Sequence, residues 1–168
     1  MTPIVSIIMG STSDLPVMEK AAKFLDDMDV PFEMNALSAH RTPAEVESFA
    51  RNAKARGIRV IIAGAGMAAA LPGVIAASTT VPVIGVPIKG MLDGLDAMLS
   101  IIQMPPGIPV ATVGVNGAQN AAILAVEVLA LADEALAKRL EQYKDSLKEK
   151  IVKANAELAT VCYKNKTN

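Results

Sequence analysis

Tryptophan is absent from this 168-residue sequence, and cysteine and histidine each occur once. The single cysteine, Cys162, cannot form an internal disulfide and has no neighbours at metal-ligand spacing, so we interpret it as inert and expect a reducing, cytoplasmic environment. With only two tyrosines and three phenylalanines, the chain has few rings on which a flavin can stack. Neither tyrosine falls near the end of a predicted strand, which argues against a flavin-binding module.

An excess of charge of either sign is also missing. Sixteen Lys and Arg residues are balanced by 17 Asp and Glu residues, so no broad positive field is available to hold nucleic acid or a membrane surface. No apolar run approaches the roughly 18 to 20 residues that span a bilayer. The first strand pattern begins by Ile4 without a basic flank typical of an export signal. We therefore expect neither a nucleic-acid partner nor a membrane partner.

Small apolar residues are abundant instead. Hydrophobic residues make up 52% of the chain although aromatic residues make up only 3%, and Ala, Val, Ile and Met supply most of the excess. This composition favours close helix packing and surface buried between subunits, so we expect a homo-oligomer. The length fits one domain, with its body over residues 1–132 and a helical extension of the same domain over residues 133–168.

Apolar runs alternate with helical patterns along the chain. Strands are predicted over residues 4–9, 30–37, 59–63, 81–86 and 109–115. Helices are predicted after residue 14, over residues 43–56, up to residue 79, and over residues 92–103, 116–131 and 133–159. This alternation implies parallel βαβ units. It predicts a doubly wound α/β domain, flavodoxin-like or Rossmann-like, with three αβα layers, a five-stranded parallel sheet and an extra C-terminal helix.

Ligands bind such sheets outside the carboxyl ends of the strands, near the point where the strand order reverses. The segment Gly10-Ser11-Thr12-Ser13-Asp14 follows the first predicted strand and precedes a helix. It offers backbone N–H groups and three hydroxyls where a helix dipole favours an anion such as phosphate. An alternative of about equal weight is that Ser13 or Asp14 only caps the helix.

The segment Ser38-Ala39-His40-Arg41-Thr42-Pro43 ends the second predicted strand and contains the only imidazole. Arg41 is a fixed cation suited to phosphate, and an imidazole ordinarily titrates near neutral pH and can carry a proton. A lone histidine is more often a solvated loop residue, but this one falls at the strand-end crevice beside an arginine. Thr42 is predicted to cap the next helix, with Pro43 in the first turn and Glu45 as capping-box partner.

The segment from Gly64 to Gly73 follows the third predicted strand and has almost no side-chain functionality. It suits a close approach of backbone to a flat ligand, although packing of a helix against the sheet explains it about equally well. Lys89, Asp93 and Asp96 follow the fourth strand, and we interpret all three as charged surface.

Four segments together closely resemble the class I N5-carboxyaminoimidazole ribonucleotide mutase family. They are residues 10–14, 38–43, 65–73 and Gln103-Met104-Pro105-x-Gly107-Ile108-Pro109. The resemblance covers about residues 4–131 and implies a flavodoxin-like fold and a homo-octamer with sites at subunit junctions. It implies a step of purine synthesis in which a carboxylate moves from N5 to C4 of a phosphorylated aminoimidazole ribonucleotide, through CO2, with neither a metal nor an organic cofactor.

The resemblance also implies roles for individual residues. His40 is expected to act as general acid and general base in both halves of the reaction. Ser11, Ser13, Ser38 and Arg41 are expected to contact the phosphate, and Asp14 to accept hydrogen bonds from the ribose hydroxyls. The substrate and the released CO2 are expected at Gly64, Gly66, Ala68, Ala69, Ala70 and Leu71.

One position departs from the family pattern. The family usually reads Ala-Ala-His-Leu-Pro-Gly, and Ala70 stands here in place of that histidine. The missing histidine is expected near the reacting carboxylate, so we expect reduced but nonzero activity.

Three other functions compete with this interpretation. The class II relatives carboxylate aminoimidazole ribonucleotide directly with CO2, but they usually carry Lys after the histidine and a polar Arg-Ser-Asn stretch in the third loop, where this chain has Arg41 and Met67-Ala68-Ala69. A non-catalytic module that binds a phosphorylated ligand is a second alternative. A phospho-receiver domain is the third, and it lacks support because the third strand ends in Ala63-Gly64 rather than in an acceptor aspartate.

Overall fold

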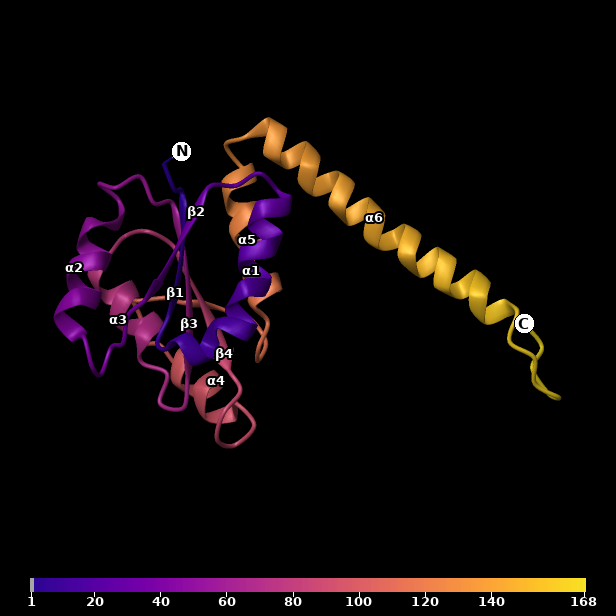
Figure 1. Ribbon diagram of the computed structural model, residues 1–168, viewed down its shortest axis with the longest axis horizontal. Helices are drawn as coiled ribbons and strands as arrows, with labels where there is room; N and C mark the ends of the chain where they lie inside the picture. The colour runs from indigo at the N-terminus through magenta and orange to yellow at the C-terminus, as the bar shows by residue number, and fades with distance from the viewer. Residues whose placement is uncertain (1) are drawn as a thin grey trace.

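The computed structural model describes residues 2–168, and its centre is a parallel sheet of five strands in the order β2-β1-β3-β4-β5 (Figure 1). The strands are β1 (Val5–Met9), β2 (Phe32–Ala36), β3 (Val60–Gly66), β4 (Val83–Ile88) and β5 (Ala111–Thr112). All five predicted strands are therefore confirmed. β1 and β4 consist wholly of buried residues, as continuous apolar runs covered on both faces should.

The bounds of four strands differ from the prediction by more than one residue. β2 is Phe32–Ala36 rather than 30–37, and β4 is Val83–Ile88 rather than 81–86. β3 continues to Gly66, because Gly64, Ala65 and Gly66 remain paired with β4. β5 has two residues, Ala111 and Thr112, instead of the predicted 109–115. It is the edge strand, and its length depends on how far β4 offers a partner, which periodicity does not reveal.

Helices α1 to α5 cover the two faces of the sheet, and α6 joins the core only at its start and projects away from the sheet (Figure 1). The helices are α1 (Leu15–Asp27), α2 (Pro43–Ala53), α3 (Leu71–Ser78), α4 (Leu95–Ile102), α5 (Ala118–Ala130) and α6 (Glu134–Ala159). Neighbouring residues of β1 point to opposite faces: Ile7 packs in the core formed with α1, α5 and the start of α6, whereas Ile8 packs in the core formed with α2, α3 and α4. The three αβα layers are those predicted.

Two helices begin later than predicted because left-handed backbone precedes them. Leu92, Asp93 and Gly94 have φ values of 47°, 54° and 90°, so α4 begins at Leu95 rather than at residue 92. Asn116 has φ of 57°, and its Oδ1 accepts a hydrogen bond of 2.8 Å from the backbone N–H of Lys89. This loop contact delays α5 to Ala118, since residues in the left-handed region cannot continue a right-handed helix.

The predicted capping box at α2 is wrong. Thr42 occupies the N-cap position and Pro43 opens the helix, but the Thr42 side chain makes no capping hydrogen bond to it. Its Oγ1 instead accepts from the Ser38 N–H at 2.9 Å and donates to the Ser38 carbonyl at 3.1 Å. Glu45 lies in the first turn of α2 without the reciprocal bond, where its charge still complements the helix dipole.

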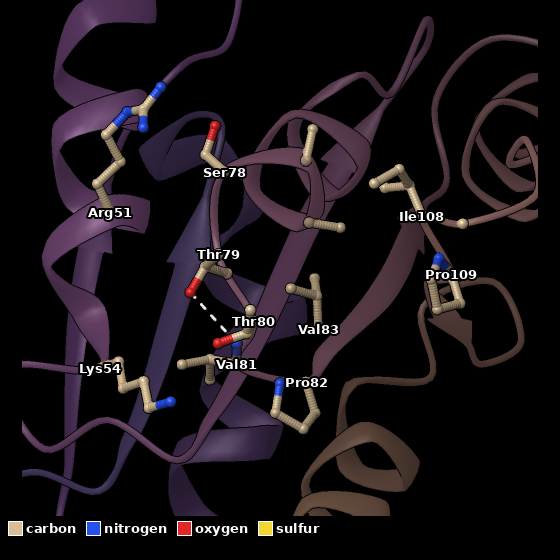
Figure 2. Close-up of a pocket in the computed structure, with 13 residues that line it drawn as sticks. Arg51, Lys54, Ser78, Thr79, Thr80, Val81, Pro82, Val83, Ile108 and Pro109 are labelled. Atoms are coloured by element: carbon tan, nitrogen blue, oxygen red, sulfur yellow. Dashed lines mark hydrogen bonds between the residues drawn. The ribbon is translucent and has the colours of Figure 1, made fainter.

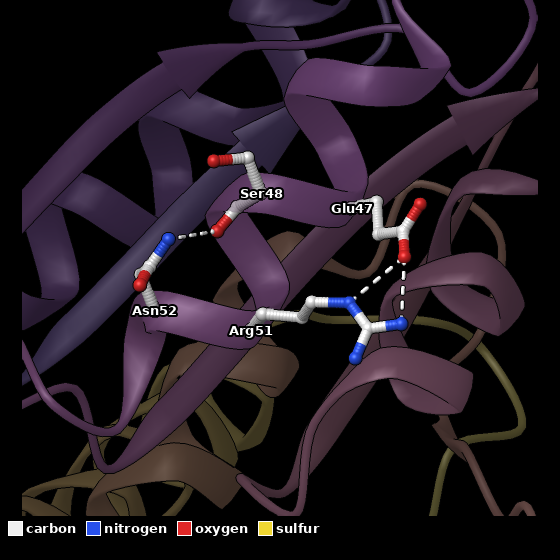
Figure 3. Close-up of polar contacts among 4 residues, drawn as sticks. All are labelled: Glu47, Ser48, Arg51 and Asn52. Carbon is white, nitrogen blue, oxygen red and sulfur yellow. Dashed lines mark hydrogen bonds and ion pairs between the residues drawn. The ribbon is translucent and has the colours of Figure 1, made fainter.

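The outer face of α2 carries polar pairs at helical spacing (Figure 3). The Arg51 Nε donates to Glu47 Oε1 at 2.8 Å, and Asn52 Nδ2 donates to the Ser48 carbonyl at 2.8 Å. Such exposed i, i+4 pairs contribute only a few tenths of a kcal/mol each. The opposite face, with Phe49 among its buried residues, therefore supplies most of the stability that fixes α2 on the sheet.

α6 extends far beyond the rest of the molecule (Figure 1). Its first turn is capped by Asp133, whose Oδ1 accepts from the Leu136 N–H at 3.0 Å, and Leu136 and Leu140 are buried in the core with α1 and α5. Further along, Ile151 and Leu158 are exposed. The predicted C-terminal helix is confirmed. That residues 133–168 extend the same domain, and that the helix reaches a partner subunit, stay predictions. No helix within residues 2–168 combines the length and the apolar content that crossing a membrane requires.

Candidate functional site

A pocket of about 340 Å³ lies at the carboxyl ends of β1, β2 and β3. This is the switch point of the sheet, because the chain passes from β1 to β2 on one side and then returns to form β3 on the other. The pocket is lined by residues 10, 11, 13, 14, 38–41 and 65–71, at the ends of these strands and in the three loops that follow them. All of the predicted site residues except Gly64 contribute to its lining, including His40.

Gly64 lies within β3, opposite Met9 of β1, and is buried. A Cβ at this position would lie 2.5 Å from the Sδ atom of Met18, so the glycine gives α1 room to pack against the sheet. Its carbonyl accepts a hydrogen bond of 3.2 Å from the Gly10 N–H. Gly64 therefore supports the first loop from beneath rather than lining the pocket.

The first loop folds into a 3-10 turn, η1 (Thr12–Asp14), before α1 begins. Ser11 Oγ accepts from the Ser13 N–H at 3.3 Å and from the Ser13 hydroxyl at 3.0 Å. Asp14 Oδ2 in turn accepts from the Ser11 N–H at 3.2 Å. Ser11 and Asp14 thus cap the 3-10 turn. The alternative that Ser13 or Asp14 caps the following helix is wrong, because no side chain makes a cap hydrogen bond to α1. The same hydroxyls line the pocket and are available to an anion.

Asp14 is a partly buried carboxylate in the pocket. Burial raises its pKa above the ordinary aspartate value, and hydrogen bonds from the Ser11 N–H and Ser13 and the positive charge of Arg41 lower that pKa only in part. Desolvation is the dominant effect because it penalises the charged form. The pocket therefore holds a carboxylate that gains from any donor a ligand brings, such as a sugar hydroxyl.

Arg41 joins the first and second loops. Its Nη2 donates to the Gly10 carbonyl at 2.9 Å, and its Nε donates to Ser38 Oγ at 3.3 Å. Since a guanidinium has five N–H donors in a fixed plane, these two bonds orient the group and leave further donors for a phosphate. Arg41 is exposed at the mouth of the pocket, where a phosphate can approach it.

His40 lies beside Arg41 on the pocket wall and is exposed. Within residues 2–168, no protein hydrogen bond holds its ring. The imidazole is thus accessible to a ligand in the pocket, as a proton-transferring group must be.

The third loop contributes backbone and small apolar groups. Met67 has φ of 53°, and tight turns follow in which the Ala69 N–H donates to the Met67 carbonyl at 2.8 Å and the Ala70 N–H to the Ala68 carbonyl at 2.7 Å. Ala70 immediately precedes α3 and lines the pocket. This wall has no hydrogen-bonding side chains, so it suits the flat or apolar part of a ligand.

The sequence predictions missed several lining residues. Gly10, Ala39, Ala65 and Met67 also line the pocket. All four belong to the three segments that the sequence indicated, so their place in those segments was the available signal. Nothing in the sequence indicated that the backbone at Met67 is left-handed.

A larger cleft of about 890 Å³ lies at the opposite end of the strands, where β4 and β5 begin (Figure 2). It is lined by the last turns of α2 and α3, the loop before β4, and residues 107–109. Its charged lining residues are Arg51 and Lys54, and its Thr79 Oγ1 accepts from the Val81 N–H at 3.2 Å. None of its lining residues is a histidine or a carboxylate, so the smaller pocket is the better candidate for chemistry.

Comparison with known proteins places these loops in a family context. A family described as AIR carboxylase matches residues 4–150. The N5-carboxyaminoimidazole ribonucleotide mutase of Pyrococcus abyssi is 60% identical over 87% of this chain and 84% of its own length. The protein of the same name from Thermotoga maritima is 48% identical over 99% of this chain and 98% of its own length.

A solved structure with the same fold and a longer relative also match this chain. The crystal structure of Treponema denticola PurE has a TM-score of 0.84 and 31% identity, covering 93% of this chain and 98% of that chain. The phosphoribosylaminoimidazole carboxylase of Schizosaccharomyces pombe is 52% identical over 98% of this chain, which spans only 30% of that protein's length. The flavodoxin-like fold predicted from the sequence is thereby confirmed.

The raised pKa of Asp14 predicts how stability depends on pH. A carboxyl whose pKa is higher in the folded state stabilises that state below its unfolded pKa, and this contribution is lost as pH rises through the folded pKa. Asp14→Asn removes the buried charge and keeps a side-chain oxygen for the Ser11 N–H. We therefore expect the free energy of unfolding of the variant minus that of the original chain to be larger at pH 7 than at pH 3. Urea unfolding at the two pH values measures this difference, and a change in the opposite direction would contradict the assignment.

Proposed function

The chain belongs to the AIR carboxylase family, and we propose that it is an N5-carboxyaminoimidazole ribonucleotide mutase, an isomerase of purine biosynthesis. The reaction moves a carboxylate from the exocyclic N5 to ring carbon C4 and yields 4-carboxy-5-aminoimidazole ribonucleotide. The observation that carries the proposal is the single pocket where the only imidazole, an arginine and the serine hydroxyls converge. The mutase relatives, which match nearly full length, support it.

The phosphate of the nucleotide is assigned to the side of the pocket formed by the first two loops. The Ser11, Ser13 and Ser38 hydroxyls line this side together with Arg41. Arg41 is already oriented by its bonds to Gly10 and Ser38, so little side-chain freedom is lost when its remaining donors engage an anion. Asp14 is assigned to the ribose hydroxyls, whose O–H groups donate to its carboxylate.

Chemistry is assigned to His40. As a general acid, the protonated imidazole gives its proton to N5 of the carbamate, and the N–C bond then breaks to release CO2 and the neutral amine. C4 of the electron-rich ring attacks the CO2 carbon, forming the new C–C bond. As a general base, the imidazole next removes the C4 proton and restores the aromatic ring. The proton taken from C4 replaces the one given to N5, so one group suffices for both halves.

The third loop is assigned to the reacting carboxylate and to CO2. Gly66, Ala68, Ala69 and Leu71 line this part of the pocket and present no hydrogen-bonding side chains. A small apolar molecule gains from such a wall, whereas water finds few partners there. Confinement keeps the CO2 within reach of C4 instead of allowing it to escape.

The mutase function is better supported than direct carboxylation of aminoimidazole ribonucleotide. Relatives of similar length carry the mutase name. Among the relatives, the name phosphoribosylaminoimidazole carboxylase belongs to a longer protein, of which this chain spans 30%. Arg41 after the histidine and the apolar third loop also favour the mutase over the class II alternative. A non-catalytic module would not require an accessible imidazole beside the proposed phosphate site, so His40 favours an enzyme over that alternative.

We assign the enzyme to the cytoplasm, where purine precursors are made, and expect a homo-oligomer, in our proposal an octamer with sites at subunit junctions. α4 supports the oligomer, because Leu95, Leu99 and Ile102 are 57%, 43% and 55% exposed along one side of it. Apolar surface of this kind is expected to be covered by a second copy.

Light scattering after size exclusion tests the oligomer. We expect a mass several times the 17.5 kDa of one chain, and we expect Leu99→Asp to lower it because a charge cannot be buried unpaired at an interface. Ser48→Asp, on the exposed face of α2, is the matched control and should leave the mass unchanged. A single species of one-chain mass for the original protein would contradict the assembly.

His40→Asn tests the proton-transfer role. The amide approximates the shape of the ring but cannot exchange a proton, so conversion should be abolished. Affinity for the nucleotide should stay within about tenfold, or about 1.4 kcal/mol. Turnover without ATP, followed together with nucleotide binding by calorimetry, separates the two effects. If binding were lost as completely as turnover, His40 would be a ligand contact rather than the acid and base.

Ala70→His tests the departure from the family pattern. Ala70 lines the pocket at the start of α3, so an imidazole introduced there can reach the carboxylate, and turnover should rise. Ala77→His is the matched control, because Ala77 lies near the other end of the same helix and lines the other cleft. Unchanged turnover in Ala70→His would show that the missing histidine does not limit this enzyme.

A further inference from the structure

The turn that carries His40 spans residues 38–42 and is closed by its last residue, Thr42. Thr42 Oγ1 accepts from the Ser38 N–H at 2.9 Å and donates to the Ser38 carbonyl at 3.1 Å. The Thr42 N–H donates to the same carbonyl at 2.8 Å. Three hydrogen bonds thus join the two ends of a five-residue turn. We propose that Thr42 is a positioning residue, whose hydroxyl fixes the turn so that His40 reaches the reacting atoms.

The hydroxyl of Thr42 has no other structural task at this place. It makes no capping bond to α2. Pro43 opens that helix, and the N–H groups of Ala44 and Glu45, which a capping hydroxyl would bond, receive no bond from the Thr42 side chain. Both hydrogen bonds of the hydroxyl are directed back into the turn, so they order the segment before the helix rather than the helix itself.

His40 and Arg41 depend on this turn to different degrees. The Arg41 side chain is also bonded to the Gly10 carbonyl of the neighbouring loop, so it has an anchor outside the turn. The His40 ring has no hydrogen bond to protein within the described residues, 2–168. Its position therefore follows from the backbone of residues 38–42 and from packing alone.

This inference rests on the proposed function of His40. An acid and base works only within hydrogen-bond reach of the proton that it moves, and a displacement of about 1 Å can cost roughly a hundredfold in rate. Phosphate binding is more tolerant, because several donors from two loops share it. Loss of the Thr42 hydroxyl should consequently reduce kcat much more than it raises KM.

Thr42→Val is the central variant, because it keeps the shape of the side chain and removes the hydroxyl. We expect kcat to fall by roughly tenfold to a hundredfold, with KM within about threefold of the original value. Thr42→Ser restores a hydroxyl and should recover most of the lost kcat. Thr42→Ala replaces the valine variant if that protein does not fold, and the same kcat loss is expected.

Thr79→Val is the matched control. Thr79 Oγ1 also accepts a backbone hydrogen bond, from the Val81 N–H at 3.2 Å, but it lies in the cleft at the opposite end of the strands. The control loses a comparable bond and should lose a comparable amount of melting temperature without a loss of kcat.

The outcomes separate this inference from the proposed function. If the original chain does not convert the nucleotide, the proposed function fails first. If it does, and Thr42→Val keeps kcat within twofold, the positioning role is wrong while the function stands. The role is equally wrong if Thr42→Ser fails to recover kcat, or if KM rises as much as kcat falls.

Discussion

The parallel pairing of β1 with β2 and β3 is the constraint on which the site depends. Met9, the last residue of β1, lies opposite Ala36 of β2 and Gly64 of β3. Three loops that are far apart in the sequence therefore start at one edge of the sheet. No loop contains a complete site: the first has hydroxyls, the second has the imidazole and guanidinium, and the third has an apolar wall. A slip in register would separate these groups even if every loop kept its own fold.

The same constraint explains what could be predicted from the sequence. β1 and β3 are buried and nearly continuous apolar runs, so their carboxyl ends, and with them the segments around Ser11 and Ala68, could be located. β2 is a partly buried edge strand that contains Glu33 and Asn35, so its weaker pattern gave a less direct indication of the segment around His40. Helix starts were harder, because Leu92 and Asn116 adopt left-handed backbone that no periodicity encodes. Thr42 is the clearest case: a threonine before a proline is typical of a cap, but its hydroxyl bonds to Ser38 instead. Which acceptor or donor a hydroxyl finds is decided by the fold of the whole loop.

Arg41 and His40 of the second loop have opposite physical requirements under the proposed function. Arg41 keeps its charge at any relevant pH, and its hydrogen bonds to Gly10 and Ser38 make it a fixed anchor. In the proposed mechanism His40 first gives and then takes a proton, so permanent hydrogen bonds to protein would favour one of its two forms and oppose the other. Its exposure in the pocket is consistent with that requirement. Rigidity is then supplied indirectly, through the backbone of the turn rather than through the ring.

Ala70 bears on how many proton-transferring groups this reaction needs. The carboxylate shift is an isomerisation, so every proton given to N5 is returned from C4, and a single imidazole that faces both atoms completes the cycle. A second imidazole at position 70 would add charge stabilisation for the carboxylate and CO2, not a missing proton. The wall around Ala70 has no hydrogen-bonding side chains, so under the proposed function it still confines CO2 while it lacks that charge. Under the proposed function, Ala70 therefore leaves the proton cycle of His40 and the confinement of CO2 in place. It removes only the charge that a histidine at position 70 would place beside the carboxylate and CO2.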